Sequence, residues 1–261
     1  HSFRVHTMSL LHRYALFFLC GLLAVPAVAQ EGMDGIDALD GSVLSPATLK
    51  YETNLKMGQR SMARPTVRTL AEGTHDGQSI WRVVDAVENA AQADTLLLHR
   101  ASLRPLERRV GGRMALTLTF DSMSVAGSLR AGGRARPIGR TFDQAVLSST
   151  PNMEVALATL PLEPGYTVEL PIFHLQQQNV TPTTLRVTGT DTVTVPAGTF
   201  ETYVLEAQPN GPGPAGTYYV RMAAPHHVVR ADLEITRPEG RTITATKRLT
   251  SITEGAGGGT E

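Results

Sequence analysis

The sequence predicts a mostly all-β protein with a single strongly curved antiparallel sheet, an open or half-barrel, and one short amphipathic helix packed on its concave face. Three observations predict this fold. Runs of alternating apolar and polar residues recur along the chain, glycine-containing turns separate them, and a single segment has helical periodicity. Alternation with a period of two is typical of antiparallel strands with one buried and one wet face. We expect roughly ten strands, within the usual size of large sheets.

The N-terminal segment has the features of a secretory signal peptide. Arg13 precedes the apolar stretch YALFFLCGLLAVPAVA, which ends in small residues at Ala27 and Ala29. This pattern predicts cleavage after Ala29, so residues 1–29 are expected to be an upstream extension and signal peptide. A membrane-spanning helix is the alternative, but the run is short for a bilayer core and Pro26 interrupts it. We therefore predict a periplasmic protein without stable membrane insertion after cleavage.

Composition excludes several classes of function. Lys+Arg and Asp+Glu are both 24, so the chain lacks the basic excess that nucleic-acid binding needs. The only cysteine, Cys20, lies within the predicted signal peptide and follows Leu19, where a lipidation signal has a small residue. The mature chain is then expected to have no disulfide, no thiolate nucleophile and no cysteine-based zinc site.

The remaining chain divides by composition into three parts. Residues 30–47 carry turn formers and acidic residues and are expected to form a flexible leader. Residues 48–253 are expected to form a single β-rich domain, large enough to fold without disulfides. The glycine-rich tail, residues 254–261, is expected to be disordered.

Three segments show the strand pattern most clearly: MALTLTF (114–120), TLRVTGTDTVTV (184–195) and VVRADLEI (228–235). The residues expected to point inward are Met114, Leu116, Leu118 and Phe120, then Leu185, Val187, Val193 and Val195, then Val229, Ala231, Leu233 and Ile235. Gly111-Gly112, Gly132-Gly133 and RPEGR (237–241) join neighbouring runs at hairpin spacing. Pro196-Ala197-Gly198 predicts a further corner, because proline cannot donate to a ladder and glycine tolerates a positive φ.

The single helical segment lies within STPNMEVALATLPLEPG. Asn152 is the expected N-cap and Pro161 the expected stop. Between them, apolar residues at helical spacing form one stripe: Met153, Ala156, Leu157 and Leu160. We expect this stripe to pack on the concave face of the sheet, near residues 152–160.

Catalytic and metal-binding motifs are not evident in the sequence. It contains neither a G-x-S-x-G nucleophile elbow nor H-E-x-x-H spacing, and no glycine-rich loop leads from a strand into a helix. His226 and His227 are adjacent, so on a strand they would point to opposite faces. We therefore predict no catalytic residues, no metal and no cofactor. A hydrolase built from scattered side chains such as His174 and Glu206 remains an alternative.

Apolar residues of the expected concave face offer a different hypothesis. Aromatic residues and methionine on a curved inner face can line a ligand cleft or simply fill the core. The candidate ligand-binding residues are Trp81, Val83, Tyr203, Leu205, Tyr218, Val220 and Met222.

Three stretches resemble the bacterial envelope proteins of domain of unknown function 3108. They are LKYETNLKMGQ (49–59), DTLLLHRASLRPLERRV (94–110) and VTVPAGTFETYVLEAQ…GTYYVRMAAPHHVVRADLEI (193–235). The resemblance implies an exported β-rich domain similar to the half-barrels of periplasmic lipoprotein carriers, and it implies no catalytic residue. Members of the family often have a tryptophan where this chain has Tyr218-Tyr219.

From these observations we hypothesise an exported, non-enzymatic envelope protein that holds a lipid or other apolar ligand. A purely structural envelope protein is the other alternative beside the hydrolase. Several buried methylenes would give useful affinity without marked polar residues, because each contributes about 0.8 kcal/mol.

Overall fold

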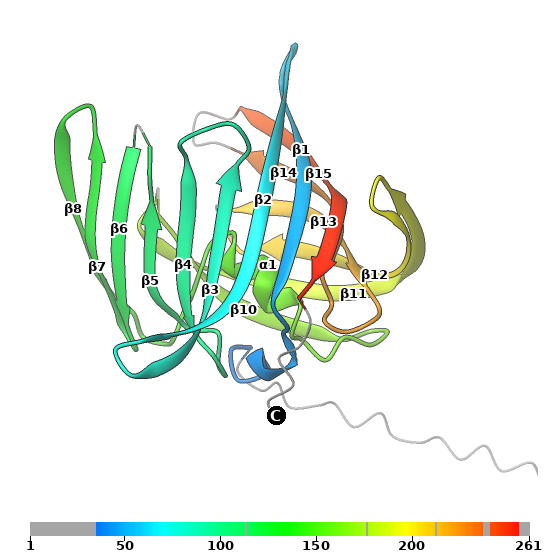
Figure 1. The fold of residues 1–261 in the computed structure, drawn as a ribbon, viewed down its shortest axis with the longest axis horizontal. Coiled ribbons are helices and arrows are strands. Elements are labelled where there is room, and N and C mark those ends of the chain that lie inside the picture. The colour runs from blue at the N-terminus through cyan, green and yellow to red at the C-terminus, as the bar shows by residue number, and fades with distance from the viewer. Residues whose placement is uncertain (1–34, 113, 176, 212, 237–240, 256–261) are drawn as a thin grey trace, which may run out of the picture. The chain divides into compact units, whose positions relative to one another are not determined.

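The computed structural model describes residues 35–112, 114–175, 177–211, 213–236 and 241–255. Within these residues fifteen strands form one sheet in the order β8-β7-β6-β5-β4-β3-β2-β1-β15-β14-β13-β12-β11-β10-β9 (Figure 1). The strands are β1 (Ala47–Met57), β2 (Arg60–His75), β3 (Gln78–Val87), β4 (Ala93–His99), β5 (Pro105–Val110), β6 (Met114–Asp121), β7 (Ser124–Ala131), β8 (Arg134–Thr141), β9 (Leu147–Ser148), β10 (Thr167–His174), β11 (Asn179–Val195), β12 (Gly198–Pro209), β13 (Pro214–Arg221), β14 (Val228–Thr236) and β15 (Thr242–Glu254). The predicted curved, unclosed antiparallel sheet is confirmed, with more strands than the ten expected.

Two meanders make up this sheet. Strands β1 to β8 follow one another in space, as do β10 to β15, and the pairing of β1 with β15 joins the two series. Every pair is antiparallel except β9 with β10, which is parallel. The predicted hairpin turn at Gly132-Gly133 joins β7 to β8, although their segments, SVAGSLRA and RARPIGRT, have few apolar residues.

Helix α1, Asn152–Leu157, lies within the curve of the sheet, and all six of its residues are buried. The predicted position is confirmed, but the N-cap is Pro151 and no side chain caps the helix. Asn152 has a different task. Its Oδ1 accepts a hydrogen bond from the Ser148 backbone at 2.9 Å, and its Nδ2 donates to the Leu103 carbonyl at 3.2 Å. Asn152 therefore ties the start of the helix to two neighbouring segments.

The segment before β1 packs against the sheet, in contrast to the flexible leader expected over 30–47. A 3-10 helix, Gly41–Val43, lies here, and Ile36, Leu39 and Leu44 are buried in the same core as Trp81. The Gly41 carbonyl accepts a hydrogen bond from Trp81 Nε1 at 2.9 Å. Apolar residues spaced among turn formers thus hold residues 35–46 in place.

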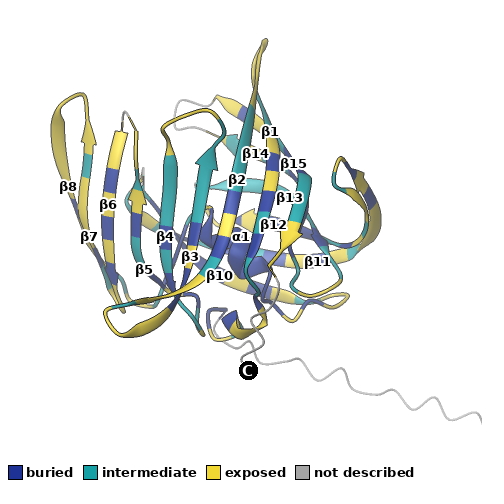
Figure 2. Cartoon of the chain, in the orientation of Figure 1, coloured by how far each residue is buried: buried dark blue, intermediate teal, exposed yellow. Residues whose placement is uncertain are grey.

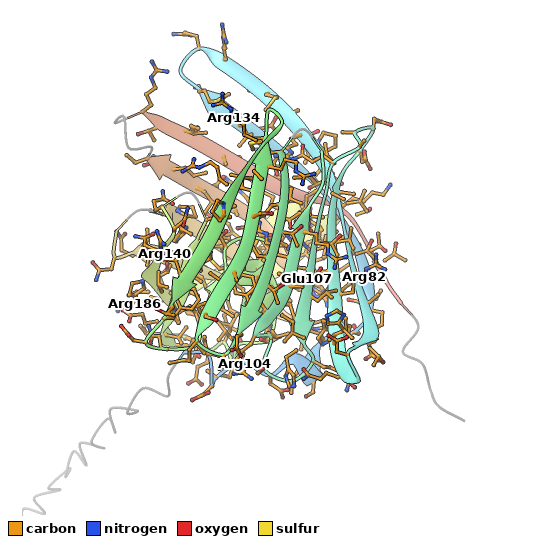
Figure 3. The ribbon with its side chains drawn as sticks, turned by 90° about the vertical axis from the view of Figure 1, so that its left-hand side faces the viewer. Arg82, Arg104, Glu107, Arg134, Arg140 and Arg186 are labelled. Atoms are coloured by element: carbon orange, nitrogen blue, oxygen red, sulfur yellow. The ribbon has the colours of Figure 1, made fainter. Side chains whose placement is uncertain are left out.

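Buried apolar residues form two cores against the sheet. The main core packs α1 and the 35–46 segment against β1 to β4 and β10 to β15. The second core consists of Leu116, Leu118, Phe120, Val125, Ile138, Val146 and Phe173. Ile172 and Phe173 are adjacent on β10 and point to opposite faces, and they belong to the main and the second core respectively. The end of the β10–β11 hairpin therefore lies inside the β6–β8 end of the sheet, and the two layers overlap (Figures 1 and 3).

Burial confirms most of the predicted inward faces (Figure 2). Leu116, Leu118 and Phe120 are buried, while Met114 is 62% exposed at the open end of β6. The corner at Pro196-Ala197 separates β11 from β12, with φ +136° at Gly198. The predicted signal peptide and most of the RPEGR turn and of the tail lie outside the described residues. None of the described helices is long and apolar enough to cross a membrane.

Candidate functional site

The structure places six of the seven candidate ligand-binding residues, all but Met222, in or against the main core. Trp81, Val83, Leu205, Tyr218 and Val220 are each at most 1% exposed and belong to the main core. Tyr203 and Met222 are half-buried. Contact of a ligand with the five core residues would require the core to open, because α1 and the 35–46 segment already cover this part of the concave face.

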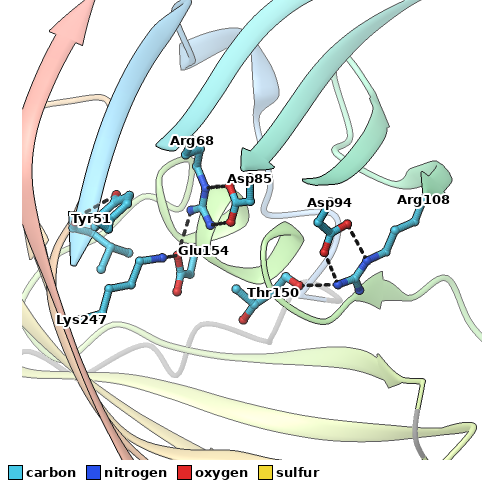
Figure 4. A network of polar contacts seen from close by, with 9 residues as sticks. Tyr51, Arg68, Asp85, Asp94, Arg108, Thr150, Glu154 and Lys247 are labelled. Carbon is cyan, nitrogen blue, oxygen red and sulfur yellow. Dashed lines mark hydrogen bonds and ion pairs between the residues drawn. The ribbon is translucent and has the colours of Figure 1, made fainter. Parts of the chain in front are cut away.

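A buried ionic network attaches α1 to the strands (Figure 4). Glu154 of the helix accepts hydrogen bonds from Arg68 Nη1 at 2.8 Å and from Lys247 Nζ at 2.5 Å. Arg68 also forms a bidentate pair with Asp85, with both N···O distances at 2.6 Å. Lys247 Nζ lies 4.1 Å from the centroid of the Tyr51 ring. Two cations and two carboxylates balance one another, so burial leaves no uncompensated charge here.

The electrostatics of the network favour its charged form. Burial alone would raise the pKa of Glu154, but Lys247 and Arg68 outweigh it and hold that pKa below its usual value of 4.5. The pKa of Asp85 is lowered in the same way, since Arg68 offsets the cost of burial. A second pair, Arg108 with Asp94 at 2.7 Å, binds the Thr150 carbonyl just before α1 at 2.8 Å. One ion pair thus reaches a side chain of the helix and the other reaches the residues just before it, and the arrangement anchors the helix.

Sequence reasoning missed this network, although one signal for it was present. Lys247 lies between Ala245 and Leu249 in the inward register of β15, so a charged residue stands where alternation demands an apolar one. Arg68 has the same relation to Leu70 on β2. Glu154 gave no such signal, because every residue of its short helix is buried.

The residues of the hydrolase alternative do not come together. His174 pairs with Asn179 at one end of β10. Glu206 lies opposite Arg186 of β11, and Arg186 in turn pairs with Thr167 at the other end of β10. His174 is buried, which lowers its pKa, and Glu206 is exposed. Among the described residues, no group of three or more His, Cys, Asp or Glu side chains is placed to hold a metal ion.

A polar hollow of about 950 Å³ lies beside the turn that follows β4. Its lining includes His99, Ser102, Arg104, Asp143 and Glu169. His99 Nδ1 lies 3.1 Å from Ser102 Oγ and accepts a hydrogen bond from the Ser102 backbone at 3.3 Å. These two residues are three apart in one turn, and none of the contacts found in the described residues joins His99 to a carboxylate. The pair therefore closes the turn and lacks the orienting acid of a catalytic triad.

An apolar groove of about 490 Å³ opens at the end of the second core, where the two overlapping layers separate. Its apolar lining comes from β5, β6, β7 and the segment after β10: Val110, Met114, Leu116, Leu129 and Leu175. Ala90, Ala91, Gln92, Gly111 and Gly112 are the other described lining residues, so none of the described residues that line the groove has an ionisable side chain. Ligand sites are concave, mostly apolar and about 300–1,000 Å³ in volume, and this groove meets all three conditions.

Comparison with known proteins identifies the family. A family model described as "Protein of unknown function (DUF3108)" matches residues 48–245. The chain belongs to this family. The resemblance seen in the sequence is thereby confirmed, and the DUF3108 match covers the sheet from β1 to the early part of β15. No curated protein matches the chain.

Several solved structures are similar to this DUF3108 chain at low identity. A beta-barrel-like protein of domain of unknown function DUF1849 from Brucella abortus is 11% identical, with a TM-score of 0.47 over 82% of this chain and 99% of that one. A DUF1329 family protein from Desulfovibrio piger is 12% identical, with a TM-score of 0.33 over 88% and 96%. A putative outer membrane lipoprotein-sorting protein domain from Vibrio parahaemolyticus is 8% identical, with a TM-score of 0.28 over 83% and 87%. Likeness at this level concerns the path of the chain and carries no information about a ligand.

Proposed function

We propose that this protein is an exported, non-enzymatic envelope protein that binds the apolar chain of a lipid or similar molecule in the groove beside Leu129. The observation that carries the proposal is an apolar groove whose floor continues directly into a packed core. Leu116 belongs both to the groove and to the second core, so a ligand chain would extend the apolar layer already there. The proposal thus places the ligand in the groove at the β6–β8 end of the sheet and not against the main core, which α1 and the 35–46 segment cover.

The energetics are adequate for such a ligand. Each methylene removed from water contributes about 0.8 kcal/mol. About ten methylenes therefore contribute roughly 8 kcal/mol, the free energy of a micromolar complex before the cost of ordering the chain. Met114 at the rim is 62% exposed and has a flexible side chain that adapts to an irregular ligand.

The test is a titration with cis-parinaric acid, a fatty acid whose own fluorescence reports its transfer into an apolar site. Leu129→Gln should weaken binding about tenfold or more, because it places an amide in the apolar wall. Tyr203→Gln is the control, since it changes a half-buried candidate residue on the main-core side of the sheet. Loss of binding in Tyr203→Gln with retention in Leu129→Gln would move the site back to the main core. Absence of binding to the unaltered protein would favour the purely structural role.

A separate activity assay tests the hydrolase alternative. Hydrolysis of a panel of esters by the unaltered protein, abolished in Ser102→Ala, would make the polar hollow an active site and overturn the non-enzymatic proposal. We expect no such activity, because His99 has no carboxylate to orient it among the described contacts.

The proposed periplasmic location rests on the apolar segment that ends at Ala27 and Ala29. N-terminal sequencing of the protein from the cell envelope should begin at Gln30. An uncleaved N-terminus, or a lipid attached to Cys20, would contradict this part of the proposal.

A further inference from the structure

Arginine is concentrated in the β7–β8 hairpin. Between Ser124 and Thr141 the chain has four arginines and no acidic residue, although the whole sequence has 24 basic and 24 acidic residues. The four are Arg130, Arg134, Arg136 and Arg140. Strand β8 is an edge of the sheet, and Arg134 lies near the free end of the hairpin (Figure 3).

The strand register places Arg136 and Arg134 on the groove face. Residues directly opposite each other in neighbouring antiparallel strands share a face, with Cβ atoms about 4.5–5.5 Å apart. One row runs Val110, Leu116, Leu129 and Arg136 across β5, β6, β7 and β8. The next row towards the rim runs Met114, Ala131 and Arg134. Each apolar row that forms the groove floor thus ends in an arginine.

These two guanidinium groups have no acidic partner among the described ion pairs, although other arginines of the chain do. Charged residues and Pro137 on an edge strand also discourage pairing with another chain. Discouraging such pairing requires charged residues on the edge strand, but it does not require them to lie on one particular face of the sheet. Three of the four arginines nevertheless share the groove face, because Arg140 has the same register as Arg134 and Arg136 while Arg130 has the opposite one.

We propose that the groove selects a single-chain amphiphile with an anionic head group, a carboxylate or a phosphate. The chain lies along Leu116 and Leu129, and Arg134 and Arg136 bind the head. Arginine suits this task because its planar donors match two oxygens of a carboxylate or phosphate at once. The inference rests on the proposed function, since it assigns the head group for the same groove.

The experiment compares four ligands that share a tetradecyl chain: tetradecanoate, tetradecyl phosphate, tetradecyl maltoside and tetradecyltrimethylammonium. Each is titrated as a monomer into the full protein by isothermal calorimetry. The two anionic ligands should bind about tenfold more tightly than the maltoside, and the cationic ligand most weakly. Raising the salt concentration should reduce both the advantage of the anionic ligands and the disadvantage of the cationic ligand relative to the maltoside, because exposed charges are screened.

Two double variants with equal loss of charge separate the head-group site from general electrostatics. Arg134→Gln with Arg136→Gln should remove the tenfold preference and leave maltoside binding unchanged. Arg82→Gln with Arg186→Gln is the control, because both arginines are exposed on the face of their strands that points away from the main core (Figure 3). Equal loss of preference in the control would overturn the head-group site.

The outcomes distinguish this inference from the proposed function. If Leu129→Gln abolishes binding of all four ligands but the head group makes no difference, the groove binds apolar chains and the anionic selectivity is wrong. If none of the ligands binds, the proposed function itself fails. Binding to anionic vesicles that depends on Arg134 and Arg136 but not on Leu129 would identify a membrane-contact surface and overturn the site for a single amphiphile.

Discussion

The two ends of the concave face are filled in different ways. At the main core, a helix, the 35–46 segment and a neutral network of buried ions cover the strands. At the β6–β8 end, seven buried residues pack between two layers of the same sheet, and the gap opens as the groove. Figure 2 shows the same contrast, since most residues of β7 and β8 are exposed. The protein therefore combines a part whose concave face is covered (the sealed part) with an edge where an apolar groove is open (the open part).

The contrast also concerns charge. In the main core, Glu154 is 2% exposed on its side chain and contacts two cations. On β8, the arginines are exposed and Arg134 and Arg136 have no acidic partner among the described ion pairs. Buried charges of the first kind stabilise only if the set is complete, whereas exposed charges of the second kind contribute little to stability and are available for binding.

Glu154→Gln tests the sealed part and should have the largest effect on stability. It leaves Lys247 as a buried cation without a carboxylate, which costs about 3–5 kcal/mol when a buried pair loses one partner. Chemical denaturation monitored by circular dichroism measures the loss. Glu72→Gln is the matched control, because Glu72 and its partner Arg100 are both about half exposed, and it should change the free energy of unfolding by less than about 1 kcal/mol. Equal effects of the two variants would contradict the comparison.

The same variant, Glu154→Gln, should change how the free energy of unfolding depends on pH in the acid range. The pKa of Glu154 and that of Asp85 are lowered in the fold, so their contribution is complete above the unfolded values of 4.5 and 3.8. It is lost as the pH falls through the folded values. Glu154→Gln should therefore be less sensitive to acid below pH 4.5 than the unaltered protein. If the free energy of unfolding had the same pH dependence in the variant and in the unaltered protein, Glu154 would not be ionised in the fold.

Sequence alone predicted the sheet, the helix position and the family, because each depends on local pattern. Alternation within β6 and helical spacing around α1 are properties of neighbouring residues. The overlap of the two layers could not be predicted in this way. It depends on Phe173 meeting β6 and β7, some fifty residues earlier in the chain, and no local pattern records that contact.

The candidate site shows the same limit. Apolar residues such as Trp81 and Leu205 were correctly expected to point inward, but alternation does not say whether an inward face is covered. The groove near Leu129 was missed because SVAGSLRA has weak alternation and its partner Leu175 comes from a distant segment. The register of β6, β7 and β8 was needed to align Arg136 with Leu129.

His227 offers a second test of the sealed part, with a somewhat smaller effect. Burial, together with nearby Arg221, lowers the pKa of His227 to about 4, so the fold holds this residue neutral. Glu254, Arg68 and His226 are the other charged or titratable groups that act on it. A lowered histidine pKa gives stability that is complete above the unfolded value of 6.5 and is lost as the pH falls towards 4. The loss over this window should be on the order of 3 kcal/mol.

His227→Leu should flatten the dependence of the unfolding free energy on pH between 6.5 and 4. The variant and the unaltered protein are compared by urea denaturation at several pH values. A slope that survives in His227→Leu would mean that another group titrates in this window.

Arg140→Ala tests the open part and should have the smallest effect on global stability. Arg140 Nε donates to the Gln178 carbonyl at 3.1 Å, which links edge strand β8 to the β10–β11 turn across the overlap. Phe142 and Phe173 meet beside it, with ring centroids 5.5 Å apart. One exposed hydrogen bond contributes at most about 1 kcal/mol, so the midpoint of global unfolding should hardly move. The effect should instead be local, because an edge that few contacts hold opens without the main core.

Amide hydrogen exchange resolves this difference between the two parts. In Arg140→Ala, amides of β7 and β8 should exchange up to about fivefold faster, which corresponds to about 1 kcal/mol, while amides of β1 and β15 keep their rates. Arg186→Ala is the control, because Arg186 is exposed on the face of β11 that points away from the main core. It should change the exchange rates of neither group of amides. If β1 and β15 accelerate together with β8, the two ends open as one unit. The groove would then depend on the rigidity of the whole sheet, and ligand binding there should raise the free energy of global unfolding as well as protect the β8 edge.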